Sequence, residues 1–152
     1  MICYTFPDLA TTIRERILQQ IAGTTLAGIP LVGGRIYRSR VEPLSRGEAP
    51  AIVVSPGPDR PDIPGSTHER TDHRLAVAIA VYVRGAVPDQ IADPICAEVH
   101  LRMMADRTLG GIAIDVIYQG WTPEMEEGDT QAGWMVAEYE VIYRTRVHSL
   151  SE

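Results

Sequence analysis

The feature that most constrains the fold is an apolar run, residues 75–83, which charged residues flank closely and which holds no Gly or Pro. Its odd positions carry large and mostly β-branched side chains, whereas Ala76, Ala78 and Ala80 occupy even positions. A β-strand sends alternate side chains to opposite faces, so this strand would have one bulky and one flat apolar face. A helix is the alternative, but the Val and Ile content favours a central strand, within residues 72–84, that is covered on both sides.

Length and charge limit the class of protein. A chain of 152 residues with an ordinary apolar content of 45% predicts a single globular domain, residues 1–152. The sequence has no apolar run of membrane-spanning length and no recognisable secretory signal, so we expect no membrane association. A net charge of −6 argues against direct sequence-specific binding of nucleic acid, because such binding normally relies on a basic surplus.

Two amphipathic helices are predicted, at residues 7–23 and 89–105. In each of them apolar side chains recur every four residues and form one stripe that can pack on a sheet: Leu9, Ile13, Ile17 and Ile21 in the first, and Ile91, Ile95, Val99 and Met103 in the second. Pro94 leaves the start of the second helix open. It can stand in the first turn with Asp93 as cap, or it can kink a helix that begins near Asp89.

Four further strands complete the predicted order α-β-β-β-α-β-β, and they fall at residues 35–41, 49–55, 112–119 and 134–146. An acidic loop, residues 121–133, separates the last two strands, with Trp121 and Trp134 facing each other across its ends. The tail, residues 147–152, is expected to be short and frayed. The pattern predicts an α+β fold in which both helices cover one face of a largely antiparallel sheet of four to five strands.

Residues 56–71 contain so many prolines and glycines that we expect a flexible, Pro-rich loop and no regular element. Far fewer residues would connect two neighbouring strands. A loop of this length predicts either a contact with a partner or a tolerated surface insertion, since additional loop length costs little entropy.

The sequence offers little chemistry. His68, Asp72 and His73 are the nearest approach to a metal cluster, but their spacing matches no strong ligand pattern. No nucleophile–base motif and no phosphate-binding glycine loop is visible, and His100 is predicted to be a solvated helix position. We therefore expect no catalytic residue, no metal and no cofactor.

Assembly is the stronger expectation. If the helices cover the bulky face of the central strand, the flat face with Ala76, Ala78 and Ala80 stays open for another subunit. The predicted strand at residues 35–41 carries arginines that are typical of an edge or of a basic contact. The predicted subunit interface thus consists of Arg35, Arg38, Arg40, Ala76, Ala78 and Ala80.

The whole layout resembles the small tail-terminator and tail-completion proteins of long-tailed phages, including the minor tail protein U family. The resemblance runs from about residue 8 to residue 146. The parts that carry it are the helix LATTIRERILQQI, the strands GRIY and AIVV, the long Pro-rich segment, the strand HRLAVAIAVYVRG and the closing pattern A-x-Y-x-V-x-Y-R-T of residues 137–145.

The resemblance implies a non-enzymatic virion protein of the tail or neck that assembles in the host cytoplasm. It implies a hexameric ring that caps the tail tube, ends tube polymerisation and joins the head, with the tail-tube protein and a head-completion protein as partners. In that setting the Pro-rich segment is the expected partner contact, through Asp59, Arg60, Asp62, His68, Glu69 and Arg70.

Three alternatives remain at this stage. The first is a head–tail connector or neck adaptor, which would bind connector rings in place of tube ends. The second is a small enzyme with a site at the Pro-rich segment that uses His68, His73 and Asp72. The third is a generic oligomeric ligand-binding domain.

Overall fold

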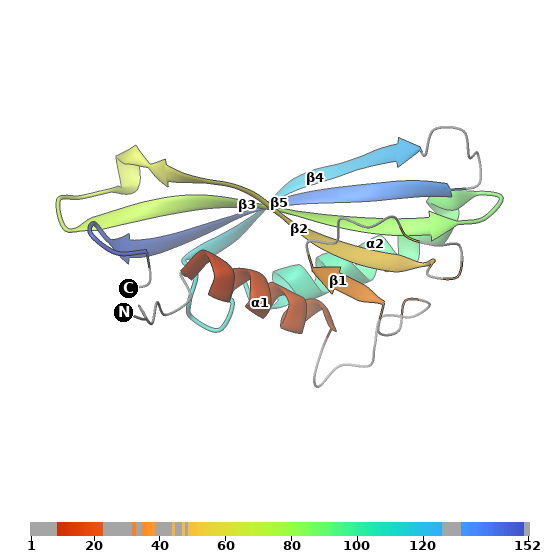
Figure 1. Ribbon diagram of the computed structural model, residues 1–152, viewed down its shortest axis with the longest axis horizontal. Coiled ribbons are helices and arrows are strands. Elements are labelled where there is room, and N and C mark those ends of the chain that lie inside the picture. The colour runs from red at the N-terminus through yellow and green to blue at the C-terminus, as the bar shows by residue number, and fades with distance from the viewer. Residues whose placement is uncertain are drawn as a thin grey trace, which may run out of the picture.

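A five-stranded mixed sheet with two helices on one face makes up the fold (Figure 1). The computed structural model describes residues 9–22, 32, 35–38, 44, 47, 49–125 and 132–150. The elements are α1 (Leu9–Ala22), β1 (Ile36–Arg38), β2 (Ala51–Asp62), the short 3₁₀ helix η2 (Ile63–Gly65), β3 (Arg70–Arg84), α2 (Pro88–Ala105), β4 (Asp115–Met125) and β5 (Ala132–Arg146). The predicted α+β class and element order are confirmed.

The apolar run lies in the middle strand of the sheet, as predicted. The strand order is β1-β2-β3-β5-β4, so β3 pairs with β2 on one side and with β5 on the other. Every pairing is antiparallel except the short parallel one between β1 and β2. The strand of arginines predicted at residues 35–41 is an edge strand, of which the structure describes Ile36–Arg38.

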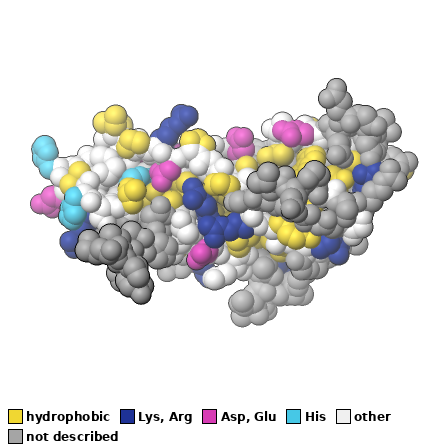
Figure 2. Space-filling model, viewed as in Figure 1, with side chains coloured by type: hydrophobic (Ala, Val, Ile, Leu, Met, Phe, Trp, Pro, Cys, Tyr) yellow, Lys and Arg dark blue, Asp and Glu magenta, His cyan; other side chains and the backbone are white. Residues whose placement is uncertain are grey.

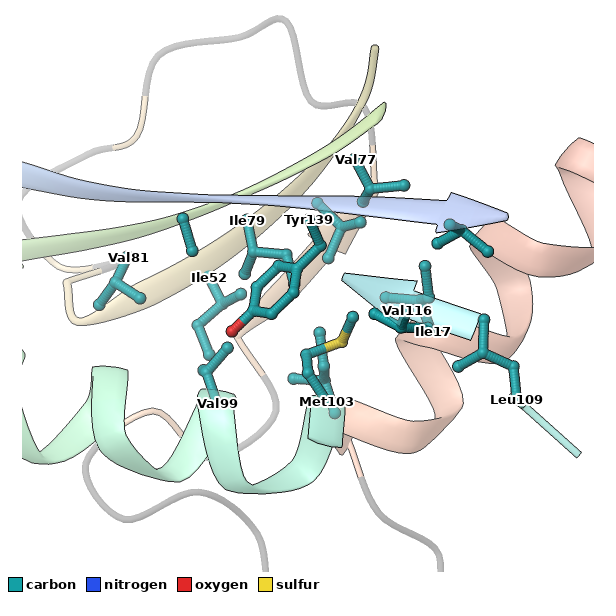
Figure 3. Packing of buried hydrophobic residues seen from close by; sticks show 14 of the residues in the cluster. Ile17, Ile52, Val77, Ile79, Val81, Val99, Met103, Leu109, Val116 and Tyr139 are labelled. Atoms are coloured by element: carbon teal, nitrogen blue, oxygen red, sulfur yellow. The ribbon is translucent and has the colours of Figure 1, made fainter. Parts of the chain in front are cut away.

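The core lies between the helices and the bulky face of β3 (Figure 3). Ile13 and Ile17 of α1 and Val99 of α2 are fully buried against Val77, Ile79 and Val81 of the sheet. Burying a side chain of this size contributes about 1.5–3 kcal/mol, so this layer supplies most of the apolar stabilisation. The predicted core residues Ile95, Leu9 and Ile91 belong to the same layer, the last two partly exposed.

The two helices are joined at their C-terminal ends by a reciprocal pair of caps. The Gln20 amide of α1 donates to the carbonyls of Arg102, Met103 and Asp106 at the end of α2. Arg102 is 2% exposed, and its guanidinium donates to the Ile21 carbonyl at the end of α1. The last carbonyls of a helix have no hydrogen-bond partner within the helix. Here a side chain of each helix donates to the free carbonyls at the end of the other.

The start of α2 resolves the ambiguity around Pro94. Pro88 stands in the first turn, where its missing N–H costs nothing, and Pro94 lies inside the helix. Of the two arrangements that the sequence allowed, the helix that begins near Asp89 is the one observed.

The predicted loop at residues 56–71 is wrong for most of its length. β2 continues through the prolines to Asp62, and β3 begins at Arg70, so only η2 and a short turn connect the two strands. Among the described residues, β1 pairs with Ile52, Val53 and Val54, and no other described strand pairs with the outer side of β2. Proline is tolerated on an edge because no neighbouring strand needs its N–H, and a bulge between Pro56 and Asp59 absorbs the irregularity.

Two further predictions about the second hairpin are corrected. β4 continues to Met125, so Trp121 and Glu124 belong to a strand and not to the acidic loop; Glu126, Glu127 and Asp129 lie outside the described residues. Trp121 pairs with Ala137, whereas Trp134 pairs with Glu124 and packs on Tyr82 at a ring distance of 4.7 Å. The two tryptophans therefore do not face each other.

The predicted frayed tail has backbone partners as far as residue 150. The Val147 N–H donates to the Glu69 carbonyl, and the Leu9 N–H donates to the Leu150 carbonyl. These bonds tie the tail both to the turn between β2 and β3 and to the start of α1.

Candidate functional site: a polar arm beyond the helices

β2, β3 and β5 extend past both helices and form a projecting part of the sheet (Figure 1). We call this part the arm and define it as residues 59–74 together with residues 142–148. Neither described helix covers the arm. Polar contacts between its side chains stabilise the arm where an apolar layer would otherwise do so. The arm contains the whole of the partner contact that the sequence predicts.

On the helix side of the arm, an imidazole lies at the centre of a buried cluster. The His73 ring stacks on the Tyr143 ring at 4.5 Å with an angle of 9°. Its Nδ1 lies 3.3 Å from Asp59 Oδ1, and its Nε2 lies 2.8 Å from Thr145 Oγ1. The Tyr143 hydroxyl donates to the other oxygen of Asp59. Each ring nitrogen of His73 therefore has a polar partner, a carboxylate from β2 on one side and a hydroxyl from β5 on the other.

The order hydroxyl, imidazole, carboxylate is the order found in nucleophilic hydrolases. Here, however, Thr145 is 1% exposed and His73 is 8% exposed. A nucleophile must reach its substrate, and this hydroxyl is enclosed by the sheet. The geometry is that of a closed polar core for the arm.

Ion pairs hold the opposite face of the arm. Arg144 donates to both oxygens of Asp72 at 2.6 and 3.1 Å, and this bidentate contact lowers the pKa of the Asp72 carboxyl. Arg74 bridges Glu140 and Asp62, and the same contacts raise the pKa of its guanidinium. The charges thus link β2, β3 and β5 across the arm.

The structure divides the predicted partner-contact residues into two groups. Asp59 and Asp62 are engaged by other residues of the arm, His73 and Arg74 respectively, although Asp59 stays exposed. Arg60, His68, Glu69 and Arg70 are exposed. The exposed residues of the turn border a shallow hollow at the end of the arm, which His68, Glu69, Arg70, Arg146, Val147 and His148 line.

The predicted subunit interface does not form one surface. Arg38 points to the helix layer and pairs with Glu15 of α1 at 3.3 Å, while Arg35 donates to the Pro50 carbonyl. Ala76, Ala78 and Ala80 are half-buried on the opposite face of the sheet. Arg40 lies outside the described residues.

The face that carries these alanines is also more polar than expected. Ala76 pairs with Glu140 of β5, and Ala78 pairs with Glu138, so carboxylates flank the small side chains. Glu138 is exposed. The expectation of a flat apolar face is corrected, because the small side chains of β3 leave room for longer charged ones beside them.

His100 is not a solvated helix position. Its Nδ1 lies 3.0 Å from the Tyr139 hydroxyl, and its ring meets the Tyr118 ring edge-on at 4.6 Å. Burial raises the pKa of Tyr139, so this phenol keeps its proton at neutral pH. Nearby Cys96 is buried, and burial raises its pKa to about 12, which leaves the thiol inert.

In the part of the chain that the structure describes, no three His, Cys, Asp or Glu side chains converge to hold a metal ion. Neither described helix is both long enough and apolar enough to cross a bilayer. The polar cluster around His73 was missed from the sequence, although one signal pointed to it. His73 and Tyr143 have the same parity as the core residues of their strands, which places both on the helix side.

The sequence matches no protein-family model and is similar to no curated protein. The fold, in contrast, has similar solved structures. One of them is a chain of the virion of a native gene transfer agent particle. The superposition has a TM-score of 0.61 at 17% identity and covers 94% of this chain and 100% of that chain. At this identity the likeness shows the fold alone.

Proposed function

We propose that this chain is a structural protein of a tailed phage or a phage-derived particle. The observation that carries the proposal is the shared fold with a gene transfer agent virion chain, since the two chains match over nearly their whole lengths. The resemblance in sequence layout to tail-terminator proteins points in the same direction.

Within that class we propose the role of tail terminator. The chain would form a ring, most simply a hexamer, on the end of the tail tube, stop the growth of the tube and present the surface that joins the head. Its partners would be the tail-tube protein and a head-completion protein, and its place the tail or neck of the virion. The arm suits such a role, because ion pairs and hydrogen bonds link its three strands. It thereby holds exposed charges at a fixed distance from the helix-covered part of the sheet.

The enclosed Thr145 argues against the alternative of an enzyme on the arm. A test is His73→Ala, which would abolish any reaction that uses the imidazole, whereas His68→Ala would leave the buried cluster intact. Hydrolytic activity that is lost in the first variant and kept in the second would contradict the structural role.

The terminator role is tested by co-assembly with the tail-tube protein from the same genome. We expect tubes of short and uniform length that bear a ring at one end in electron micrographs, and longer, uneven tubes without this chain. Binding to portal-side connector rings, with tube length unchanged, would support the neck adaptor in its place. A gene position between the head-completion genes and the tail-tube gene is the corresponding genomic expectation.

A further inference from the structure

We propose that two copies of this chain pair through the first half of β4, so that their two sheets join edge to edge. β4 is the last strand of the sheet, and no described strand pairs with its outer side (Figure 1). The contact relates the two copies by a two-fold axis, whereas a ring is built from head-to-tail contacts. The inference therefore goes beyond the proposed ring and concerns the free chain.

The two edges of the sheet differ in what they offer to another strand. On the outer side of β2, three prolines in residues 56–61 lack the N–H that strand pairing requires. The second half of β4 is irregular, because a bulge lies between Tyr118 and Gly120 and Pro123 follows. Residues 115–119 precede the bulge and contain no proline, no glycine and no basic residue. This stretch therefore lacks the features by which strand edges usually avoid pairing.

The backbone of this stretch also has pairing groups to offer. The Val116 N–H donates to the Asp115 carboxylate at 2.8 Å, so a side chain receives it in place of a neighbouring strand. Alternate residues of an antiparallel strand direct their N–H and C=O groups to the same side, so Tyr118 directs its groups the same way as Val116. In a two-fold pair, Val116 of each copy would exchange both backbone hydrogen bonds with Tyr118 of the other.

The side chains select one register for this pair. A two-fold axis keeps the helices of both copies on the same face, so paired residues must both have odd or both have even numbers. With Ile117 on the axis, the two Ile117 side chains face each other, and Asp115 faces Gln119 of the other copy. Moving the axis by one residue would either set Asp115 against Ile117 or bring the bulge before Gly120 into the pairing.

Exposed apolar side chains lie beside this register. Tyr118 is 42% exposed, and its ring meets the His100 ring of α2 at 4.6 Å. Ile114, just before the strand, is 48% exposed, and Leu101, next to His100, is 63% exposed. In Figure 2, hydrophobic and acidic side chains lie along the rim where Figure 1 draws β4. A second copy of the edge would remove part of this apolar surface from water.

The charges at the edge permit a contact between identical chains. Within each copy Arg107 neutralises Asp115 through two hydrogen bonds of 2.8 Å. Gln119, which faces Asp115 in the pair, is an uncharged amide, so no like charges lie opposite each other. At longer range the net charge of −6 makes the two copies repel. Added salt should therefore strengthen the association, because it screens that repulsion.

Cross-linking at a single position tests the register. The two Ile117 residues would form a non-hydrogen-bonded pair with Cα atoms about 4.5 Å apart, which lies within the range of a disulfide. Ile117→Cys, in a chain that also carries Cys3→Ser, should give a covalent dimer when oxidised glutathione is the oxidant. Thr122→Cys in the same background is the matched control. Thr122 is exposed on the same strand but lies beyond the bulge, so it should give no dimer.

A pair of variants checks the register a second time. Asp115→Cys and Gln119→Cys, each in the Cys3→Ser chain, would place each cysteine opposite a natural residue of an identical copy. Each variant alone should therefore form little covalent dimer. An equimolar mixture should form the mixed disulfide, because residues 115 and 119 face each other in the proposed pair.

The non-covalent contact is measured by analytical ultracentrifugation, in which the natural chain should dimerise as its concentration rises. Ile117→Lys should weaken the dimer at least about tenfold, because it sets two like charges directly opposite each other. Ile63→Lys is the same substitution at a residue of η2 that is 79% exposed, and it should leave the dimerisation unchanged. Thermal unfolding of both variants separates lost association from lost folding.

Any of four results would overturn the inference. They are a natural chain that is monomeric at every concentration, cross-linking of Thr122→Cys that equals that of Ile117→Cys, a mixture of the Asp115→Cys and Gln119→Cys chains that forms no mixed disulfide, and an Ile117→Lys chain that dimerises like the natural one. None of these measurements involves a tail tube, so their outcome does not depend on the terminator role.

Discussion

The body under the helices and the arm beyond them share the same three strands but are stabilised by different interactions. In the body, β3 presents Val77, Ile79 and Val81 to two helices, and apolar burial supplies the free energy. In the arm, the same alternation presents His73 to Tyr143 and Asp59, and hydrogen bonds and ion pairs link the strands. A sheet can therefore extend past its hydrophobic cover when polar side chains satisfy one another across it.

The two kinds of stabilisation differ in magnitude. Each buried aliphatic side chain of the body contributes about 1.5–3 kcal/mol, whereas a hydrogen bond to a charged group contributes about the same only when both partners are shielded from water. Arg144 and Arg74 remain 48% and 42% exposed, so solvent screens their contacts. We infer that the arm opens at a lower free energy than the body.

The largest effect is expected from Ile79→Ala in the body. Ile79 is fully buried at the centre of β3, and the cavity should lower the free energy of unfolding by about 3–4 kcal/mol. Urea denaturation checks this value. Ile63→Ala is the matched control, since Ile63 is 79% exposed and its loss should change stability by less than about 0.5 kcal/mol. Equal losses would mean that the two regions are not stabilised differently.

Asp72→Asn in the arm should lower the free energy of unfolding by a smaller amount, about 1–2 kcal/mol, because it leaves Arg144 without its carboxylate. Amide exchange of the arm should accelerate more than that of the central part of β3. Unchanged arm exchange would show that this ion pair contributes nothing.

The same ion pair predicts a pH dependence. Since Arg144 lowers the pKa of Asp72 in the folded state, the unfolded chain binds the proton more readily. Above the ordinary carboxyl pKa of about 4, Asp72 makes its full contribution to the free energy of unfolding. That contribution is lost as the pH falls through the lowered pKa of Asp72 in the folded state. The Asp72→Asn variant should therefore lose less stability than the natural chain below about pH 4. Hydrogen bonds to Thr108 and Gly110 also lower the pKa of Asp106. Both the natural chain and the Asp72→Asn variant should therefore still lose some stability at acid pH.

Tyr143→Phe should cost about 1 kcal/mol, because it keeps the ring stacked on His73 and removes only the hydroxyl that donates to Asp59. A double-mutant cycle with Asp59→Asn isolates that bond. Additive losses in the cycle would show that the hydroxyl and the carboxylate act independently.

The smallest effect is expected from Arg107→Ala. Arg107 and Asp115 form a bidentate pair at 2.8 Å, but their side chains are 55% and 36% exposed. The loss should stay within about 0.5 kcal/mol in urea denaturation. A loss comparable to that of Asp72→Asn would mean that exposure does not weaken the ion pairs of this protein.

Prediction from sequence worked where one physical rule dominated. Alternation in residues 75–83 located the central strand, and apolar residues at every fourth position located both helices. Each period places apolar side chains on one face of one kind of element, so it indicates that element directly. It went wrong at Pro56 and Pro61, where proline indicated a loop. The missing information was that no described strand pairs with the outer side of that part of β2, and no local pattern reports what lies beside a strand.

The site was harder to predict for a related reason. Asp59, His73 and Thr145 come from three strands that are distant in the sequence, and only the register of the pairing brings them together. His68, Glu69 and Arg70 were predicted as a partner contact because they lie next to one another in the chain, and the structure shows that they are exposed. The same holds for a small apolar crevice lined by Val83, Pro88, Pro123, Trp134 and Met135, because these residues come from α2, β3, β4 and β5.

The prolines of β2 have a further consequence for a protein that would exist at high local concentration during assembly. Along the outer edge of β2, Pro56, Pro58 and Pro61 offer no N–H to an incoming strand. Two sheets therefore cannot fuse there into a continuous ladder, which is the usual route from exposed edges to fibrils. Copies of the chain can contact one another on that side only through side chains. Such contacts can dissociate, so wrongly placed subunits can leave a growing assembly.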